Sequence, residues 1–94
     1  MSKTISVEYF AQSRLIAGTA QETIQLDDDA DLDGLLAALA TRHGEPMCKL
    51  LGGSGRRRSP GLLIAIGGRQ IPAGEPGPLW DGDCVTVLPA ISGG

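Results

Sequence analysis

Side chains that could perform covalent chemistry are few in this sequence. The one histidine, His43, and the first cysteine, Cys48, could in principle form a nucleophile pair. Both fall at or just beyond the end of an expected helix, however, and no neighbouring group would orient them. A histidine in the last turn of a helix is also explained by its favourable interaction with the helix dipole. We therefore expect no catalytic pair at this position.

The two cysteines, Cys48 and Cys84, match neither a zinc site nor a disulfide framework. They form no Cys-x-x-Cys pair, and only His43 could join them as a ligand. The sequence therefore predicts no metal site. Two reduced thiols are typical of an intracellular protein.

Three further polar patterns have structural explanations. The glycine-rich residues 52–55 lack the Gly-Lys-Ser/Thr ending of a phosphate-binding loop. Asp81 and Asp83 flank Gly82, which is typical of a turn rather than of paired catalytic carboxylates. The three arginines at 56–58 could meet an acidic partner or a phosphate, but no aromatic residue accompanies them, and a solvated loop is the simpler interpretation. None of the three patterns predicts a catalytic site.

The last two residues, Gly93 and Gly94, are the pattern that best supports a chemical role. Two glycines have no side chains to block a narrow channel, and they permit extended or positive-φ backbone. The group then available for chemistry is the α-carboxylate, which becomes an acyl donor only after activation, for example as an acyl-adenylate. The alternative is a frayed terminus, because chain ends are often glycine-rich and poorly ordered. Which interpretation holds depends on the fold that carries the tail.

Length and composition limit that fold to a small domain. The chain has 94 residues, of which 41% are hydrophobic and 20% charged, so we expect one globular domain over residues 1–94. Its net charge of −3 argues against a nucleic-acid partner. No apolar run approaches a membrane span, and the N-terminus does not resemble a signal peptide. We therefore expect a cytoplasmic protein that has no membrane partner.

The first half of the chain predicts a hairpin followed by a helix. Residues 4–10 alternate like a half-buried strand with Ile5, Val7 and Tyr9 inward; residues 11–18 form a connection, and residues 21–26 return with Ile24 and Leu26 inward. Asp31 is the expected N-cap of a helix that ends at Gly44. Its apolar stripe follows helical spacing and consists of Leu32, Leu35, Leu36 and Leu39.

The second half predicts short strands separated by loops. Residues 45–60 are expected to form a flexible exposed loop, most mobile over 52–59. A strand at 63–66, a Gly67-Gly68 turn and a short return strand at 69–71 follow. After a winding connection, Leu79-Trp80 tuck under the sheet, and the last strand, 84–88, inserts beside the first. A flexible tail, 89–94, ends the chain. The fold class is α+β: a β-grasp, or ubiquitin-like, mixed sheet of four to five strands with one main helix on one face.

The sequence resembles the MoaD/ThiS family of ubiquitin-like sulfur carriers over most of its length. The resemblance is carried by Tyr9-Phe10-Ala11, the leucine-striped helix, Asp81-Gly82-Asp83, and the ending Pro-Ala-Ile-Ser-Gly-Gly at 89–94. Phe10-Ala11-Gln12 and the proline of the tail are most like the small subunit of molybdopterin synthase. Two features depart from the family: Gly67-Gly68 where a turn often begins with Asn, and a long loop with three arginines.

The resemblance implies a mechanism that uses the tail alone. An E1-like enzyme would adenylate the Gly94 carboxylate with ATP, and a persulfide donor protein would convert it to a thiocarboxylate. Gly93 would give the tail flexibility and fit the partner's channel. The large subunit of molybdopterin synthase would then use this sulfur to convert a pterin precursor in molybdenum cofactor biosynthesis. The carrier would have no catalytic side chains and no permanently bound cofactor.

Three alternatives remain open at this point. The carrier could serve another pathway, such as thiamine, cysteine or another sulfur-containing metabolite. It could be a ubiquitin-like modifier joined to proteins through Gly94, or a plain β-grasp interaction module with an idle tail.

Strand parity predicts a docking surface. Ile5, Val7 and Tyr9 are expected to face the core, so Phe10 faces outward. In the last strand Val85 and Val87 are expected to face the core, so Leu88 also faces outward. The alternative is a bend at each strand end that tucks both side chains inward. If both side chains face outward on neighbouring strands, Phe10 and Leu88 form an apolar patch at the end of the last strand, where the tail begins. We expect Phe10 and Leu88, with Pro89, Ile91 and Ser92 of the tail, to contact the partner.

Overall fold

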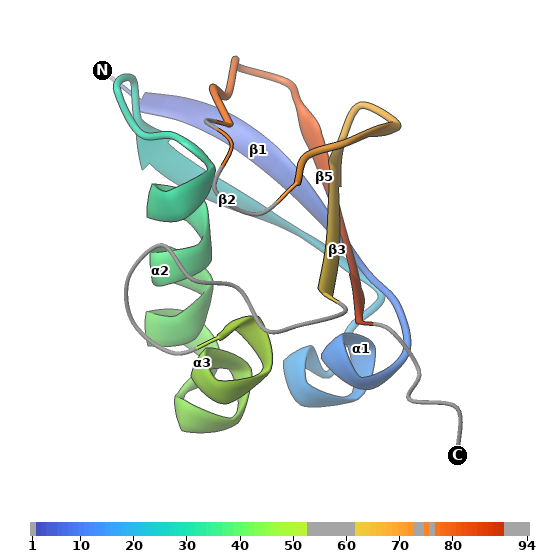
Figure 1. Ribbon diagram of the computed structural model, residues 1–94. Coiled ribbons are helices and arrows are strands. Elements are labelled where there is room, and N and C mark those ends of the chain that lie inside the picture. The colour runs from blue at the N-terminus through green and yellow to red at the C-terminus, as the bar shows by residue number, and fades with distance from the viewer. Residues whose placement is uncertain (1, 53–61, 73–74, 76, 90–94) are drawn as a thin grey trace.

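The computed structural model describes residues 2–52, 62–72, 75 and 77–89. Figure 1 shows a sheet with helices packed against it. In chain order the elements are β1 (Ser2–Tyr9), α1 (Gln12–Ala17), β2 (Gln21–Asp27), α2 (Leu32–His43), α3 (Glu45–Leu51), β3 (Leu62–Ile66), β4 (Arg69–Gln70) and β5 (Cys84–Pro89). Among these residues, no helix combines the length and apolar character needed to cross a membrane.

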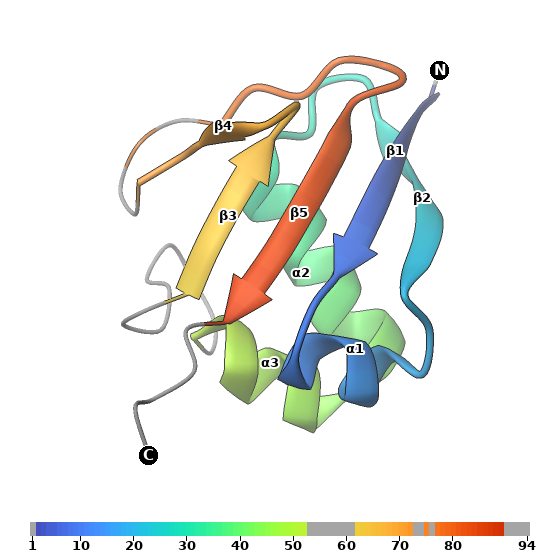
Figure 2. The ribbon, with the colours of Figure 1, turned by 90° about the vertical axis from the view of Figure 1, so that its right-hand side faces the viewer.

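The strands form one mixed sheet in the order β2-β1-β5-β3-β4 (Figure 2). β1 and β2 are antiparallel, with Ile5 opposite Ile24, as the hairpin pattern predicts. β5 lies parallel to β1 and antiparallel to β3. The prediction that the last strand inserts beside the first is confirmed, and so is the α+β, ubiquitin-like β-grasp fold.

The longest helix, α2, covers one face of this sheet and closes the core (Figure 1). Its start is as predicted, because the Asp31 side chain accepts a hydrogen bond from the Gly34 backbone N–H at 3.1 Å. The inward side chains of β1, β2 and β5 also have the predicted faces. The buried set includes Ile5, Val7, Tyr9, Ile24, Leu26, Leu32, Leu35, Leu36, Leu39, Ile64, Val85 and Val87.

A helix at 45–51 corrects the expectation of an exposed loop over 45–60. In α3, Met47 and Leu51 lie one turn apart and are 0% and 4% exposed, so this segment packs against the core. Pro46 is compatible with the first turn of a helix, and Gly52 ends it with a positive φ. Residues 53–60, with the three arginines, lie outside the described residues, and so does most of the segment predicted to be most mobile.

A second correction concerns residues 11–18, which were expected to be a plain connection. They contain the short helix α1, which ends at Gly18 with a φ of 75°. Ile16 and Ala17 pack against the core, and Ser13 is completely buried. Over the described residues, two short helices therefore accompany the one predicted main helix.

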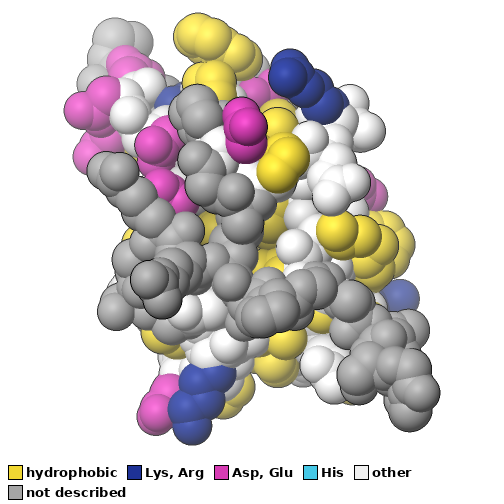
Figure 3. All heavy atoms as spheres, in the orientation of Figure 1, with side chains coloured by type: hydrophobic (Ala, Val, Ile, Leu, Met, Phe, Trp, Pro, Cys, Tyr) yellow, Lys and Arg dark blue, Asp and Glu magenta, His cyan; other side chains and the backbone are white. Residues whose placement is uncertain are grey.

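The end of the sheet where β1 begins is held by polar contacts with connecting segments. Lys3 is only 5% exposed, and its Nζ donates to the backbone carbonyls of Asp28, Ala30 and Leu79. Around that turn, acidic side chains gather on the surface (Figure 3, upper left). Three exposed members of the acidic group are consecutive: Asp27, Asp28 and Asp29.

The predicted turn at 81–83 is also confirmed. The Asp81 carboxylate accepts from the Thr4 backbone N–H at 2.7 Å, and the Asp83 carboxylate accepts from the Trp80 N–H at 2.8 Å. Leu79 is buried as expected, but Trp80 is 71% exposed, so its predicted place under the sheet is wrong. Adjacent side chains of extended backbone point in opposite directions, and only one of the two can reach the core.

Pro89 corrects the predicted start of the tail. It is the last residue of β5, lies opposite Leu62 and is buried. The Val87 carbonyl accepts from the Phe10 N–H, so the backbone nitrogen of Pro89, two residues on, points to the same side, where β1 has already ended. A proline there removes no hydrogen bond from the ladder. Its burial also argues against the predicted direct contact of its side chain with a partner.

Candidate functional site

Three large apolar side chains are exposed on the outer face of the sheet near the end of β5. Phe10 and Leu88 are 45% and 39% exposed, so the alternative in which both tuck inward is wrong. The Tyr9–Val87 register and the hydrogen bond from the Phe10 N–H to the Val87 carbonyl at 3.1 Å place them on neighbouring strands. We call Phe10, Leu63 and Leu88 the apolar patch.

Leu63 is a member of the patch that the sequence reasoning missed. It lies opposite Leu88 in the β3–β5 register and is 41% exposed. The signal was present, because Ile64 faces the core and its neighbour must then face outward. Beside the patch is a shallow hollow of about 170 Å³, lined by Leu63, Ile64, Ala65, Gly68, Gln70, Thr86 and Leu88.

The tail continues from this same end of β5. Ala90, Ile91, Ser92, Gly93 and Gly94 lie outside the described residues. The structure therefore places two of the expected contact residues, Phe10 and Leu88, close together at the strand end from which the tail leaves. The predicted roles of Ile91 and Ser92 in partner binding, and of Gly93 and Gly94 in chemistry, stay predictions.

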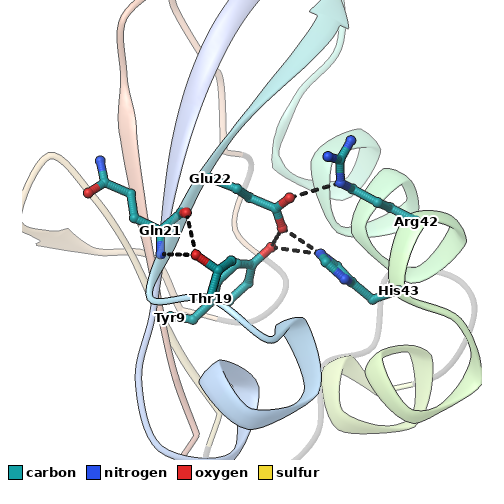
Figure 4. Close-up of polar contacts among 6 residues, drawn as sticks. All are labelled: Tyr9, Thr19, Gln21, Glu22, Arg42 and His43. Carbon is teal, nitrogen blue, oxygen red and sulfur yellow. Dashed lines mark hydrogen bonds and ion pairs between the residues drawn. The ribbon is translucent and has the colours of Figure 1, made fainter.

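A cluster of polar side chains lies on the core side of the sheet, where β1, β2 and α2 meet (Figure 4). The Glu22 carboxylate accepts hydrogen bonds from the Tyr9 hydroxyl and from His43, and Arg42 Nε lies 2.8 Å from its other oxygen. Burial raises the pKa of Tyr9, and the bond to Glu22 adds to this effect. Burial also opposes ionisation of Glu22, but the bonds from Tyr9 and His43 and the nearby positive charge hold its pKa below 4.5.

The cluster explains His43 without a catalytic role. Sequence reasoning placed this histidine at a helix end and found no orienting group, whereas Glu22 provides one from a different element. The available signal was the parity of β2, which puts Glu22 on the same face as the buried Ile24 and Leu26. Because the carboxylate is already paired with three donors, the arrangement locks the ends of β1, β2 and α2 together.

The second cysteine, Cys84, is not placed for nucleophilic chemistry. The Cys84 thiol lies 3.3 Å from Glu8 on the outer face, and burial together with this carboxylate raises its pKa. A raised pKa reduces the thiolate fraction at neutral pH. Over the described part of the chain, no three side chains of His, Cys, Asp or Glu come together as metal ligands would.

Comparisons with known proteins match most of the chain. The model of the ThiS family matches residues 7–94. The molybdopterin synthase sulfur carrier subunit of Chlamydomonas reinhardtii is 30% identical over 92 residues, covering 96% of this chain and 98% of that protein.

Two solved structures share the fold over nearly the whole chain. The HVO 2177 protein of Haloferax volcanii has a TM-score of 0.82 at 26% identity and covers 99% of this chain and 88% of that one. A Pyrococcus furiosus protein provisionally assigned as molybdopterin converting factor, subunit 1, has a TM-score of 0.73 at 32% identity and covers 95% and 99%.

Proposed function

The chain belongs to the ThiS family, and from this we propose that it is a ubiquitin-like sulfur carrier that serves as the small subunit of molybdopterin synthase. The observation that carries the proposal is the apolar patch of Phe10, Leu63 and Leu88 at the end of β5, from which the Gly-Gly tail continues. A docking surface next to a reactive chain end suits a protein that delivers its own terminus to a partner. The similarity to a molybdopterin synthase sulfur carrier subunit supports the choice of pathway.

The proposed chemistry takes place at the Gly94 carboxylate. A carboxylate oxygen attacks the α-phosphorus of ATP in an E1-like enzyme, which releases pyrophosphate and leaves an acyl-adenylate. The terminal sulfur of a protein persulfide then attacks the acyl carbon and displaces AMP. A second thiol cleaves the S–S bond of this acyl disulfide, so that the sulfur stays on Gly94 as a thiocarboxylate and the thiols leave as a disulfide.

The role of the folded domain is then recognition. The patch contacts the activating enzyme or the large subunit, and the tail enters that partner's active site, where the pterin precursor receives the sulfur. Neither step needs a side chain of the carrier to take or give a proton. This is consistent with the polar side chains of the described domain: Glu22, on the core side of the sheet, is paired with three donors, and the Cys84 thiol on the outer face has a raised pKa.

Intact mass spectrometry tests the chemistry. The protein is incubated with ATP, an E1-like adenylating enzyme and a persulfide donor, and we expect one oxygen of the chain end to be replaced by sulfur. A mass that stays unchanged with all components present would make the domain a plain interaction module. Isopeptide-linked products instead of the thiocarboxylate would identify a protein modifier. Sulfur transfer to a pterin precursor by the added large subunit separates the proposed pathway from other sulfur-transfer pathways.

Variants of the patch test the docking surface. Burying one such side chain at an interface is worth roughly 1.5–3 kcal/mol, so Phe10→Ala or Leu88→Ala should weaken binding to the large subunit about tenfold or more. Thermal stability should fall much less, because both side chains are already exposed in the free protein. The assignment of the apolar patch as a docking surface is wrong if both variants bind the activating enzyme and the large subunit as tightly as the unchanged protein.

A further inference from the structure

The residue that holds the backbone of Phe10 is a buried serine in α1. The Ser13 side chain is 0% exposed, and its hydroxyl donates to the Phe10 carbonyl at 2.7 Å. The same oxygen accepts from the Phe10 N–H at 3.1 Å and lies 3.3 Å from the Val87 carbonyl. One hydroxyl therefore joins the residue that presents the patch aromatic to the strand that leads into the tail.

The residue between Phe10 and α1 has a strained backbone. Ala11 has φ 55° and ψ −131°, and it is the only non-glycine residue with a positive φ in the described part of the chain. Such a conformation costs on the order of 1–3 kcal/mol and persists only where surrounding contacts enforce it. The Ser13 hydrogen bonds close directly across this turn, and the Ala11 carbonyl accepts from the N–H groups of Arg14 and Leu15.

Ordinary helix capping does not explain the serine. The N-cap position of α1 is Ala11, and no side chain caps the helix there. The N–H of Phe10 already has a partner in the Val87 carbonyl, so for this group the hydroxyl adds a second contact. What the hydroxyl adds is a fixed position for Phe10 relative to β5.

We propose that Ser13 is a positioning residue for docking: its hydroxyl fixes the strained Phe10–Ala11 turn against the end of β5, so that the Phe10 ring is presented beside Leu88 before a partner binds. This inference rests on the proposed function, since it assumes that Phe10 contacts the partner. Fixing a contact residue in advance lowers the ordering cost of binding, which strengthens the complex without adding a contact. Ser13 itself is buried and does not contact the partner.

A double-mutant cycle tests the positioning role. Binding of the full chain to the large subunit of molybdopterin synthase is measured by calorimetry for the unchanged protein, Ser13→Ala, Phe10→Ala and the double variant. We expect Ser13→Ala to weaken binding about three- to tenfold in the unchanged background and by less than about twofold in the Phe10→Ala background, because coupled residues are not additive. Equal losses in both backgrounds, or no loss from Ser13→Ala, would overturn the proposal.

A readout in the free protein separates positioning from general stability. Amide hydrogen exchange of Phe10 should accelerate in Ser13→Ala while that of Ile5, in the middle of β1, keeps its rate. Asp31→Ala is the matched control, since it removes one exposed hydrogen bond at the start of α2 and lowers stability without touching the patch. If Asp31→Ala weakens binding as much as Ser13→Ala, the effect is only loss of stability and the proposal is wrong.

The outcomes also distinguish this proposal from the proposed function. If Phe10→Ala weakens binding while Ser13→Ala does not, the docking surface stands and only the positioning role fails. If Phe10→Ala binds like the unchanged protein, the contact that Ser13 is proposed to position does not exist and the positioning role fails, whereas the docking surface fails only if Leu88→Ala also binds like the unchanged protein. Ser13→Cys, which fills the same space with a weakly hydrogen-bonding group, replaces Ser13→Ala if that variant does not fold.

Discussion

At the scale of single residues, the polar side chains that the described structure places next to the core have hydrogen-bond partners: Lys3, Ser13 and Glu22. Glu22 is the clearest case, because its carboxylate is mostly covered and accepts from Tyr9 and His43 while Arg42 approaches its other oxygen. An unpaired carboxylate in this position would oppose folding. The cluster should therefore connect the stability of the domain to pH.

Glu22→Gln is expected to make the free energy of unfolding less dependent on pH in the acidic range. The pKa of Glu22 lies below 4.5 in the folded protein, so the folded state binds fewer protons than the unfolded state. The stabilisation is then fully present above about pH 4.5 and is lost as pH falls through the folded pKa. Denaturant unfolding from pH 7 to pH 3 should show the variant clearly less stable at neutral pH, and the difference should shrink on acidification.

Glu45→Gln provides the matched control for this measurement. The Glu45 side chain is 78% exposed and lies 3.5 Å from Lys49, an exposed pair of the kind that contributes little. The free energy of unfolding of Glu45→Gln should equal that of the unchanged protein at every pH. A constant difference between Glu22→Gln and the unchanged protein down to pH 3 would contradict the assigned role of the carboxylate.

At the scale of elements, the sequence predicts the strands and the long helix, whose patterns are regular, and misses the two short helices. The four inward leucines of α2 give a helical stripe, and alternation in β1 assigns both the core residues and the outward Phe10. α1 and α3 have only six and seven residues, too few for a clear period. The helical spacing of α3 is visible in only two apolar residues, Met47 and Leu51. The glycines and arginines that follow them favour a loop, so the sequence does not predict this helix. The Glu22 cluster joins three elements, so no single segment shows it.

Met47→Ala tests whether α3 is a packed part of the core. Met47 is completely buried, and removing such a side chain typically costs 2–5 kcal/mol, so we expect a loss of about 2–4 kcal/mol in the free energy of unfolding. Lys49→Ala is the control in the same helix, because the Lys49 side chain is 76% exposed and alanine favours helix. The free energy of unfolding of both variants is measured by urea denaturation. Equal, small losses in the two variants would show that residues 45–51 do not pack against the core.

At the scale of the whole molecule, the two ends of the sheet have different tasks. At the end where β1 begins, Lys3 and Asp81 tie loops to the strand through backbone groups. At the other end, β5 leads to the tail, and the apolar patch leaves side chains exposed that a core would bury. The buried core lies between the two ends and includes side chains from residue 5 to residue 87. Stability and the proposed function therefore reside in different residues.

This separation predicts that the tail and the core can be changed independently. Deleting Gly94, or replacing Gly93 by valine, should abolish thiocarboxylate formation, because the first removes the reacting end and the second adds bulk that the partner's channel excludes. The melting temperature should stay nearly unchanged, because a glycine has no apolar side chain to bury in a core. Leu39→Ala should do the opposite: Leu39 is completely buried, so the melting temperature falls, while sulfur transfer persists below it. Differential scanning calorimetry and intact mass spectrometry on the same samples measure both properties. Normal sulfur transfer without Gly94, or a large loss of stability on its deletion, would contradict the separation.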